Sequence, residues 1–182
     1  MTDATLPLPL HLGFLTVFAE GTGFLGGYLV TNSWGRPIEF RLSTAVQPNR
    51  VQQILYGATL TDYLCADLIG KTLIEKSATP IQLLVTDSVH VLPIRTRVDV
   101  PVVAVVPGEP PAAATSDRAL AALTHPRSSV PLLFRLEHPG DEGAVRAILD
   151  RLDAALDLSE PFGRIREAMT EARKMGVTSR AA

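Results

Sequence analysis

The sequence has little of several features on which common protein functions depend. It contains one cysteine, Cys65, so no intramolecular disulfide can form, and one thiol among four scattered histidines is a poor basis for a structural zinc site. No apolar run approaches the roughly 18 residues that a membrane span needs, and Asp3 stands where a signal peptide has basic residues. These absences predict a soluble, cytoplasmic protein with no membrane segment.

The chain also lacks an excess of positive charge. Its 17 basic and 19 acidic residues give a formal net charge of -2, so there is no global surplus of cations to release counterions from a nucleic-acid backbone. Glycine-rich phosphate loops, dinucleotide fingerprints, zinc-protease motifs, Cys-x-x-Cys pairs and nucleophile elbows are missing from the sequence as well. A common nucleotide or zinc enzyme is therefore not expected, and we predict no cofactor.

What the chain does contain is the composition of a folded domain. Its 182 residues are 46% hydrophobic and 20% charged, which is enough for one sizeable core. The only low-complexity stretch, residues 107–117, is rich in proline and alanine and predicts an exposed connector. We expect an α/β core over residues 1–106 and a C-terminal strand with helices over residues 118–182, packed on the same core.

Three strands are predicted at the start of the chain. Residues 10–18 and 27–32 are rich in Leu, Phe, Thr and Val, and Gly35 in the turn between residues 32 and 37 predicts a hairpin to a third strand. In this third strand apolar and polar residues alternate, which predicts one buried and one solvated face: Ile38, Phe40 and Leu42 against Glu39, Arg41 and Ser43.

A long or kinked helix is predicted over residues 49–77. Apolar residues recur at helical spacing in two consecutive runs, namely Val51, Ile54, Leu55 and Ala58, then Leu64, Cys65, Leu68, Ile69 and Thr72. Gly57 lies between the two runs and predicts the kink. Because Cys65 falls on the second run, we expect a buried thiol with a raised pKa, and a thiol enzyme that uses Cys65 is the weaker interpretation.

The remaining elements complete an α/β pattern. Residues 81–86, 98–106 and 130–136 predict strands, and residues 118–123 predict a short alanine-rich helix. Two further helices follow, the first with an apolar stripe made of Val145, Ile148, Leu149, Leu152 and Leu156. The sequence thus predicts a mixed sheet that opens with antiparallel strands, in the order β-β-β-α-β, and a helical C-terminal end.

Other titratable residues are assigned to the surface. The carboxylates of the long helix, Asp62, Asp67 and Glu75, are expected on its solvated face. Most of the histidines, which lie in separate segments, are also expected to be surface residues: His11, His90, His125 and His138.

Four short segments resemble motifs of the ribonuclease H-like fold. Ala19-Glu20-Gly21-Thr22 is similar to the acid-Gly-Ser/Thr motif that ends the first strand of that fold, and Gly26-Gly27-Tyr28 to the Gly-Gly-Tyr that opens its second strand. Asn49-Arg50-Val51-Gln52 resembles the opening of its first helix, and Val85-Thr86-Asp87-Ser88 resembles the end of its fourth strand. The resemblance implies this element order and a nuclease site in which carboxylates hold two divalent metal ions.

Carried over position by position, the resemblance makes Glu20 and Asp87 the candidate catalytic and metal-binding acids. It implies Mg²⁺ or Mn²⁺ as the cofactor and nucleic acid as the substrate. The corresponding helix position is Gln52, a neutral group that binds Mg²⁺ weakly. A divergent ribonuclease H-like nuclease that uses Glu20 and Asp87 is therefore the alternative function.

The densest group of recognition residues lies between residues 19 and 53. Trp34 and Arg36 at the hairpin turn form an aromatic and cationic pair that is typical of binding hot spots, although packing of Trp34 onto the sheet is equally compatible with the sequence. Asn49, Arg50 and Gln52 add polar groups suited to hydrogen bonding. The leading prediction is a non-catalytic binding or assembly module that recognises a protein partner or a second copy of itself through this segment.

Overall fold

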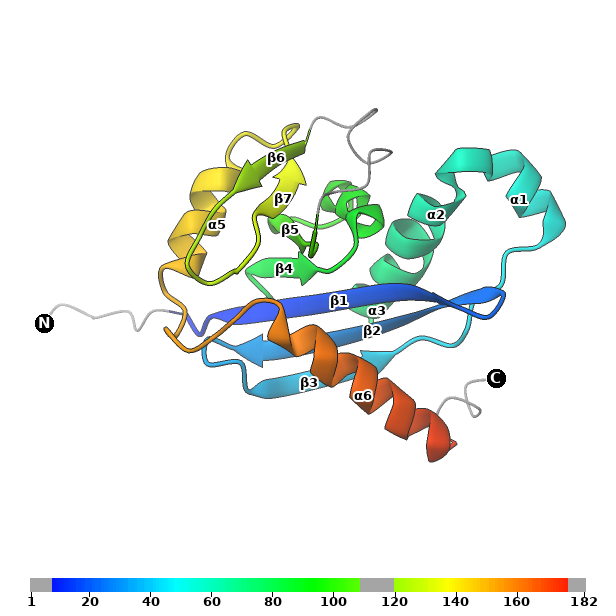
Figure 1. The fold of residues 1–182 in the computed structure, drawn as a ribbon, viewed down its shortest axis with the longest axis horizontal. Helices are drawn as coiled ribbons and strands as arrows, with labels where there is room; N and C mark the ends of the chain where they lie inside the picture. The colour runs from blue at the N-terminus through cyan, green and yellow to red at the C-terminus, as the bar shows by residue number, and fades with distance from the viewer. Residues whose placement is uncertain (1–7, 109–119, 177–182) are drawn as a thin grey trace, which may run out of the picture.

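The computed structural model describes residues 8–108 and 120–176. Most of the predicted connector lies outside the described residues, as do residues 1–7 and 177–182. The described residues form one mixed sheet with helices on both of its faces (Figure 1). No helix among them is long and apolar enough to cross a membrane.

The sheet has seven strands in the order β3-β2-β1-β4-β5-β7-β6. Their bounds are β1 (His11–Glu20), β2 (Gly23–Asn32), β3 (Pro37–Leu42), β4 (Leu83–Thr86), β5 (Val102–Val105), β6 (Leu120–Leu123) and β7 (Leu132–Arg135). The first three strands are antiparallel, and β4 lies parallel to β1 on its other side. The predicted mixed α/β class and the predicted β-β-β-α-β order are confirmed.

The predicted long helix between β3 and β4 is a helical segment with a break near its start. It consists of α1 (Arg50–Tyr56), the 3-10 turn η1 (Gly57–Thr59), α2 (Leu60–Asp62), the π-helical η2 (Tyr63–Gly70) and α3 (Lys71–Glu75). α1 ends at Gly57, whose φ of 50° lies in the region that favours glycine. The predicted kink at this residue is confirmed.

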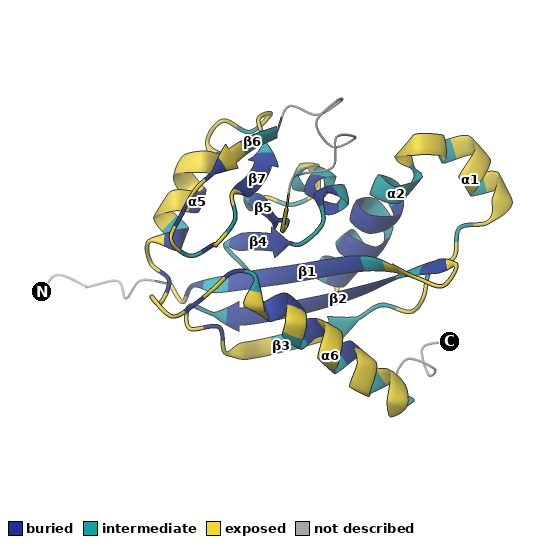
Figure 2. Ribbon diagram, viewed as in Figure 1, coloured by how far each residue is buried: buried dark blue, intermediate teal, exposed yellow. Residues whose placement is uncertain are grey.

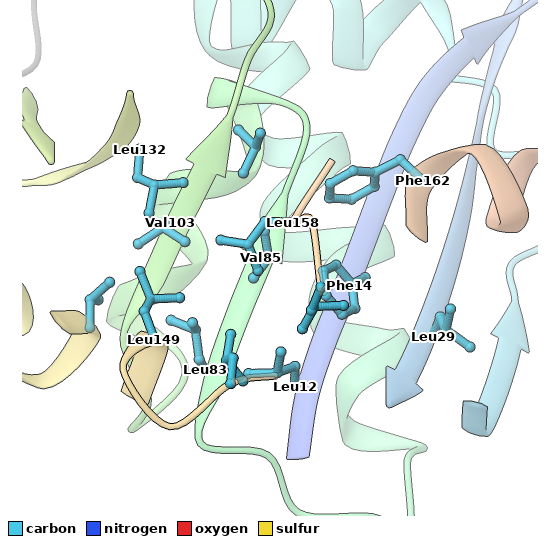
Figure 3. Close-up of a cluster of buried hydrophobic side chains, with 14 of the residues drawn as sticks. Leu12, Phe14, Leu29, Leu83, Val85, Val103, Leu132, Leu149, Leu158 and Phe162 are labelled. Carbon is cyan, nitrogen blue, oxygen red and sulfur yellow. The ribbon is translucent and has the colours of Figure 1, made fainter. Parts of the chain in front are cut away.

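Two hydrophobic clusters fill the space between the sheet and the helices on its two faces. One face carries the long helical segment and η3 (Val89–Thr96), and the other carries α5 (Asp141–Leu149) and α6 (Glu160–Lys174). Figure 3 shows the second cluster, where Phe14 of β1 meets Phe162 of α6 edge to face with ring centroids 5.8 Å apart. This packing fixes α6 across β1 and β2.

α6 approaches the sheet closely because β2 has no side chain at the crossing point. A Cβ atom on Gly27 would lie 2.5 Å from Cγ2 of Ile165 and 2.7 Å from Sδ of Met169, both closer than real Cβ contacts. Gly27 thus has a packing role. It determines where the polar residues of α6 reach the edge of the sheet.

The face assignment of β3 was wrong. Ile38 and Phe40, predicted to be buried, are 46% and 38% exposed, whereas the side chain of Glu39, predicted to be solvated, is 14% exposed. β3 is an edge strand, and α6 packs mainly against β2 and β1, so the apolar face of β3 is only partly covered. The opposite face is covered by the turn that follows α3, which binds Glu39.

The alanine-rich helix predicted at residues 118–123 was also wrong. Residues 118 and 119 lie outside the described residues, and Leu120–Leu123 form β6, which pairs antiparallel with β7. A six-residue helix is too short to be stable by propensity alone, so hydrogen bonding to β7 outweighs the helix preference of alanine. The predicted helical stripe from Val145 to Leu156 was too long, because α5 ends at Leu149 and Leu152 and Leu156 lie beyond it. Val145, Leu149, Leu152 and Leu156 are nevertheless buried, and Ile148 is partly buried.

Candidate functional site

The carboxyl end of β4 and the middle of β1 bring together polar residues that lie far apart in the sequence. Asp87 follows β4 directly, and the pairing of Leu15 with Thr86 places Thr16 beside it. Thr16 Oγ1 donates a hydrogen bond to Asp87 Oδ2 at 3.1 Å. This edge of an open α/β sheet is where ligand sites commonly form, and we call the group of Thr16, Asp87 and their α6 partner the β4-edge site.

The α6 partner in the β4-edge site is Arg166. Its guanidinium forms an ion pair with Asp87 and donates a hydrogen bond to Thr16 Oγ1 at 3.3 Å. It also lies 5.7 Å from the ring centroid of Phe18, within the range of a cation–π contact. The side chain of Asp87 is 11% exposed and that of Arg166 is 49% exposed, so the carboxylate is the buried member of the pair.

The second predicted acid, Glu20, lies at the far end of β1. It is four residues beyond Thr16, which corresponds to about 13 Å along a strand. Its carboxylate pairs with Arg173, seven residues beyond Arg166 on α6, a separation of about 10 Å along a helix. The structure therefore does not bring Glu20 and Asp87 together.

The side chains around Asp87 and Glu20 do not fit the two-metal centre that the family resemblance implies. Paired catalytic metal ions lie only about 3.5 to 4 Å apart and share their carboxylate ligands. In the β4-edge site, the β1 residue beside Asp87 is a threonine, and both predicted acids already have an arginine partner. The described part of the chain contains no group of three or more His, Cys, Asp or Glu side chains placed to bind a metal ion.

Gln52, the residue at the third position of the resemblance, has a structural role. Its side chain accepts a hydrogen bond from the backbone N of Asn49 at 3.0 Å, and Asn49 Oδ1 accepts one from the backbone N of Gln52 at 2.9 Å. This reciprocal pair is a capping box that begins α1. The similarity of residues 49–52 to the opening of a helix is thus explained by capping.

The predicted recognition residues are divided between the two ends of β3. Trp34 is 66% exposed in the β2–β3 turn, where Asn32 Oδ1 accepts hydrogen bonds from the backbone N of Trp34 and of Arg36, both at 3.0 Å. Asn49, Arg50 and Gln52 follow the other end of the strand, and Figure 1 shows the turn and α1 on opposite sides of the molecule. They do not form one surface.

α1 is the most exposed apolar element of the described residues. Val51, Ile54 and Leu55 are 62%, 64% and 77% exposed, and no residue of the helix is buried. Figure 2 shows α1 almost entirely in the colour of exposed residues, at a corner of the molecule away from the sheet. The second apolar run, in contrast, packs on the sheet through Leu64, Cys65 and Ile69.

An Asp–His pair near the carboxyl end of β4 was not predicted from the sequence. His90 Nδ1 lies 2.7 Å from Asp62 Oδ1, and the side chain of Asp62 is 15% exposed, so its assignment to a solvated face was wrong. Burial lowers the pKa of His90 below its ordinary value. The sequence offered no signal for this contact, because the two residues lie 28 positions apart on different elements. Arg166 was missed for the same reason.

Cys65 is part of the core. The side chain lies in the cluster beneath the long helical segment, with 2% of the residue exposed, and burial raises the pKa of its thiol to about 12. The prediction that Cys65 belongs to the core is confirmed.

Similarity to known proteins is found among solved structures. No protein-family model and no curated protein matches this chain. Among solved structures it is similar to endonuclease V of Ciona intestinalis, in a complex with DNA that contains an inosine followed by a ribo-adenosine. The TM-score is 0.46 and the sequences are 10% identical, over 93% of this chain and 89% of that chain. Similarity of this degree does not transfer an activity to the present chain.

Proposed function

We propose that this chain is a non-catalytic binding module that docks on a partner protein through α1. The observation that carries the proposal is the exposed apolar stripe of Val51, Ile54 and Leu55. These residues are spaced i, i+3 and i+4, so they share one face of the helix. An amphipathic helix that inserts into an apolar groove of a partner uses this spacing.

The charge of the surrounding segment indicates the chemistry of the partner. Residues 43–61 contain a single charged residue, Arg50, in a chain in which 20% of the residues are charged. Depletion of charge is typical of the core of a protein interface, and one cation is too few to bind a phosphate backbone firmly. The expected partner surface is therefore an apolar groove with a neutral or acidic rim.

The small size of α1 favours a groove over a second copy of this helix. α1 has seven residues, and two such helices alone would bury less than the roughly 1,200 Å² of a specific interface. A groove surrounds the helix on several sides and buries more of the same side chains. If the chain instead self-associates through α1, the partner is a second copy of this chain.

The test uses the full chain with single substitutions in the stripe. Proteins from the source cells that bind the wild type are purified, and their affinities for Ile54→Arg and Leu55→Arg are measured. Each substitution should weaken binding at least about tenfold, because a charge would enter an apolar groove. Ala147→Arg is the matched control, since it adds the same charge to an exposed residue of α5, outside residues 43–61. Equal affinity for the wild type and both stripe variants would overturn the proposal.

The alternative is a divergent ribonuclease H-like nuclease that uses Glu20 and Asp87. It is supported by the order of the elements and by the position of Asp87 at the end of β4. The arginine partners of both acids and their separation count against it. Cleavage of DNA or RNA by the wild type in Mg²⁺ or Mn²⁺, abolished by Asp87→Asn and Glu20→Gln, would establish this alternative in place of the binding module.

A further inference from the structure

The β4-edge site contains a carboxylate whose charge must be balanced within the protein. Asp87 is largely withdrawn from solvent and lies at the end of β4, beside the parallel strand β1. A buried carboxylate is stable only with an opposite charge and hydrogen bonds to its oxygens. Thr16 supplies a hydroxyl donor, and Arg166 supplies both a positive charge and a further donor.

We infer that the guanidinium of Arg166 is the resident cation of the β4-edge site and occupies the position at which the fold resemblance implies a divalent metal ion. A guanidinium remains protonated at every pH at which a protein is folded and offers several donors in one plane. Here these donors reach Asp87 and Thr16 at once. The cation is part of the chain, so the carboxylate needs no ion from solution.

The geometry of α6 fixes this cation in place. Ile165 and Met169, on either side of Arg166 in the sequence, pack over Gly27 and leave little freedom for the helix to slide along β2. Phe18 lies beside the guanidinium on the same face of β1 as Thr16. The Asp87–Arg166 pair therefore holds α6 against the end of β4.

Glu20 and Arg173 form a second acid–arginine pair with α6, at the carboxyl end of β1. The side chains of Glu20 and Arg173 are 42% and 46% exposed, so solvent screens this pair and it contributes little to the attachment of α6 to the sheet. It serves as an internal comparison, because it is also an acid–arginine pair with α6, but it joins α6 to β1 and its carboxylate is more exposed than that of Asp87. Removing it should therefore have a much smaller effect than removing the Asp87 pair.

A divalent cation would be unfavourable at the β4-edge site as it stands. Mg²⁺ takes six oxygen ligands, and of the two described side chains that hydrogen-bond Asp87, those of Thr16 and Arg166, only Thr16 offers an oxygen. The guanidinium would also repel a second cation at this distance. The inference does not depend on the docking role of α1, and its failure would leave that proposal unaffected.

The experiment follows thermal unfolding of the full chain with and without MnCl₂. Arg166→Gln should lower Tm by roughly 5 °C or more, since it leaves a buried carboxylate unpaired, whereas Arg173→Gln should change Tm by roughly 1 °C or less. Asp87→Asn combined with Arg166→Gln should lower Tm by less than the sum of the single changes. MnCl₂ should leave the wild-type Tm unchanged.

Two results would overturn the inference. One is a saturable rise in the wild-type Tm with MnCl₂ that Asp87→Asn abolishes, because it would show that a metal ion binds the carboxylate. The other is additive loss in the double variant, because it would show that Asp87 and Arg166 act independently. If Arg166→Gln does not fold, Arg166→Lys retains the charge without the planar donor pair, and the same cycle with Asp87→Asn gives the coupling.

Discussion

At the scale of single residues, the balance between burial and hydrogen bonding decides the pKa of the ionisable side chains. Cys65 is a small hydrophobic group of the core because its surroundings disfavour the thiolate. Glu39 is the opposite case. Burial raises its pKa, but hydrogen bonds from Arg41 and from residues 77–79 outweigh burial and lower the pKa from its ordinary value of 4.5 to about 2.

The buried thiol gives a prediction about reactivity. In the native state at pH 8, Cys65 should react with a disulfide reagent such as DTNB about a hundredfold or more slowly than in urea, because the thiolate is rare and the sulfur is shielded. The reaction is followed by absorbance of the released thiolate. A native rate close to the rate in urea would contradict the assignment to the core and support a thiol-based activity.

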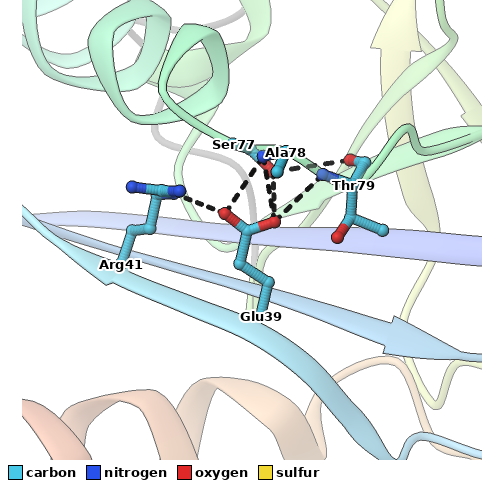
Figure 4. A network of polar contacts seen from close by, with 5 residues as sticks. All are labelled: Glu39, Arg41, Ser77, Ala78 and Thr79. Carbon is cyan, nitrogen blue, oxygen red and sulfur yellow. Dashed lines mark hydrogen bonds and ion pairs between the residues drawn. The ribbon is translucent and has the colours of Figure 1, made fainter.

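At the scale of elements, the carboxylate of Glu39 connects the edge strand β3 to the turn that follows α3. Glu39 Oε2 accepts hydrogen bonds from Ser77 Oγ at 2.9 Å and from the backbone N of Thr79 at 3.0 Å, and Ala78 N lies 3.1 and 3.2 Å from the two carboxylate oxygens (Figure 4). These donors would lack partners if the turn moved away from β3. The contact explains why the polar face of an edge strand is covered.

Glu39→Gln should reduce the free energy of unfolding by about 1–3 kcal/mol at pH 7, because a neutral amide accepts fewer of these hydrogen bonds. The folded-state pKa of Glu39 is depressed, so its stabilisation is present above pH 4.5 and is lost as the pH falls through about 2. The difference between wild type and variant in urea unfolding should therefore shrink over this range.

Glu75→Gln is the control for this prediction. Glu75 is exposed and paired with Lys71 in the next helical turn, a contact that contributes little. A difference between Glu39→Gln and the wild type that stays constant from pH 7 to pH 2 would contradict the proposed role of the charge.

At the scale of the whole molecule, a buried ion pair connects the parts of the chain before and after residues 109–119. Arg95 of η3 donates to both oxygens of Asp141, at 2.8 and 3.1 Å, and to the carbonyl oxygen of Val98 at 2.9 Å. The two side chains are 17% and 8% exposed. Asp141 begins α5, so the pair connects this helix to η3, which lies on the opposite face of the sheet.

Asp141→Asn should destabilise the protein by about 3–5 kcal/mol, because it leaves the guanidinium of Arg95 buried without a counter-charge. Chemical unfolding measures the loss. The neighbouring Glu142→Gln removes an exposed carboxylate paired with Arg146 and should cost less than about 1 kcal/mol. Equal losses for the two variants would show that the Arg95 pair contributes no more than a surface contact.

The sequence by itself determined the β-β-β-α-β order at the start of the chain, the hairpin at Gly35, the break at Gly57 and the burial of Cys65. These features follow from periodicity and from backbone preferences, which act over a few residues. The family resemblance also marked Asp87 correctly as the residue that follows β4.

Only the tertiary structure decided the rest. The contact of Asp87 with Thr16 depends on the register of β1 against β4, and the contact with Arg166 depends on where Gly27 lets α6 cross the sheet. The exposure of the α1 stripe has the same origin, since an apolar pattern predicts a helix face without saying whether another element covers it. Register, crossing points and coverage are properties of elements that meet across the chain, and local patterns do not encode them.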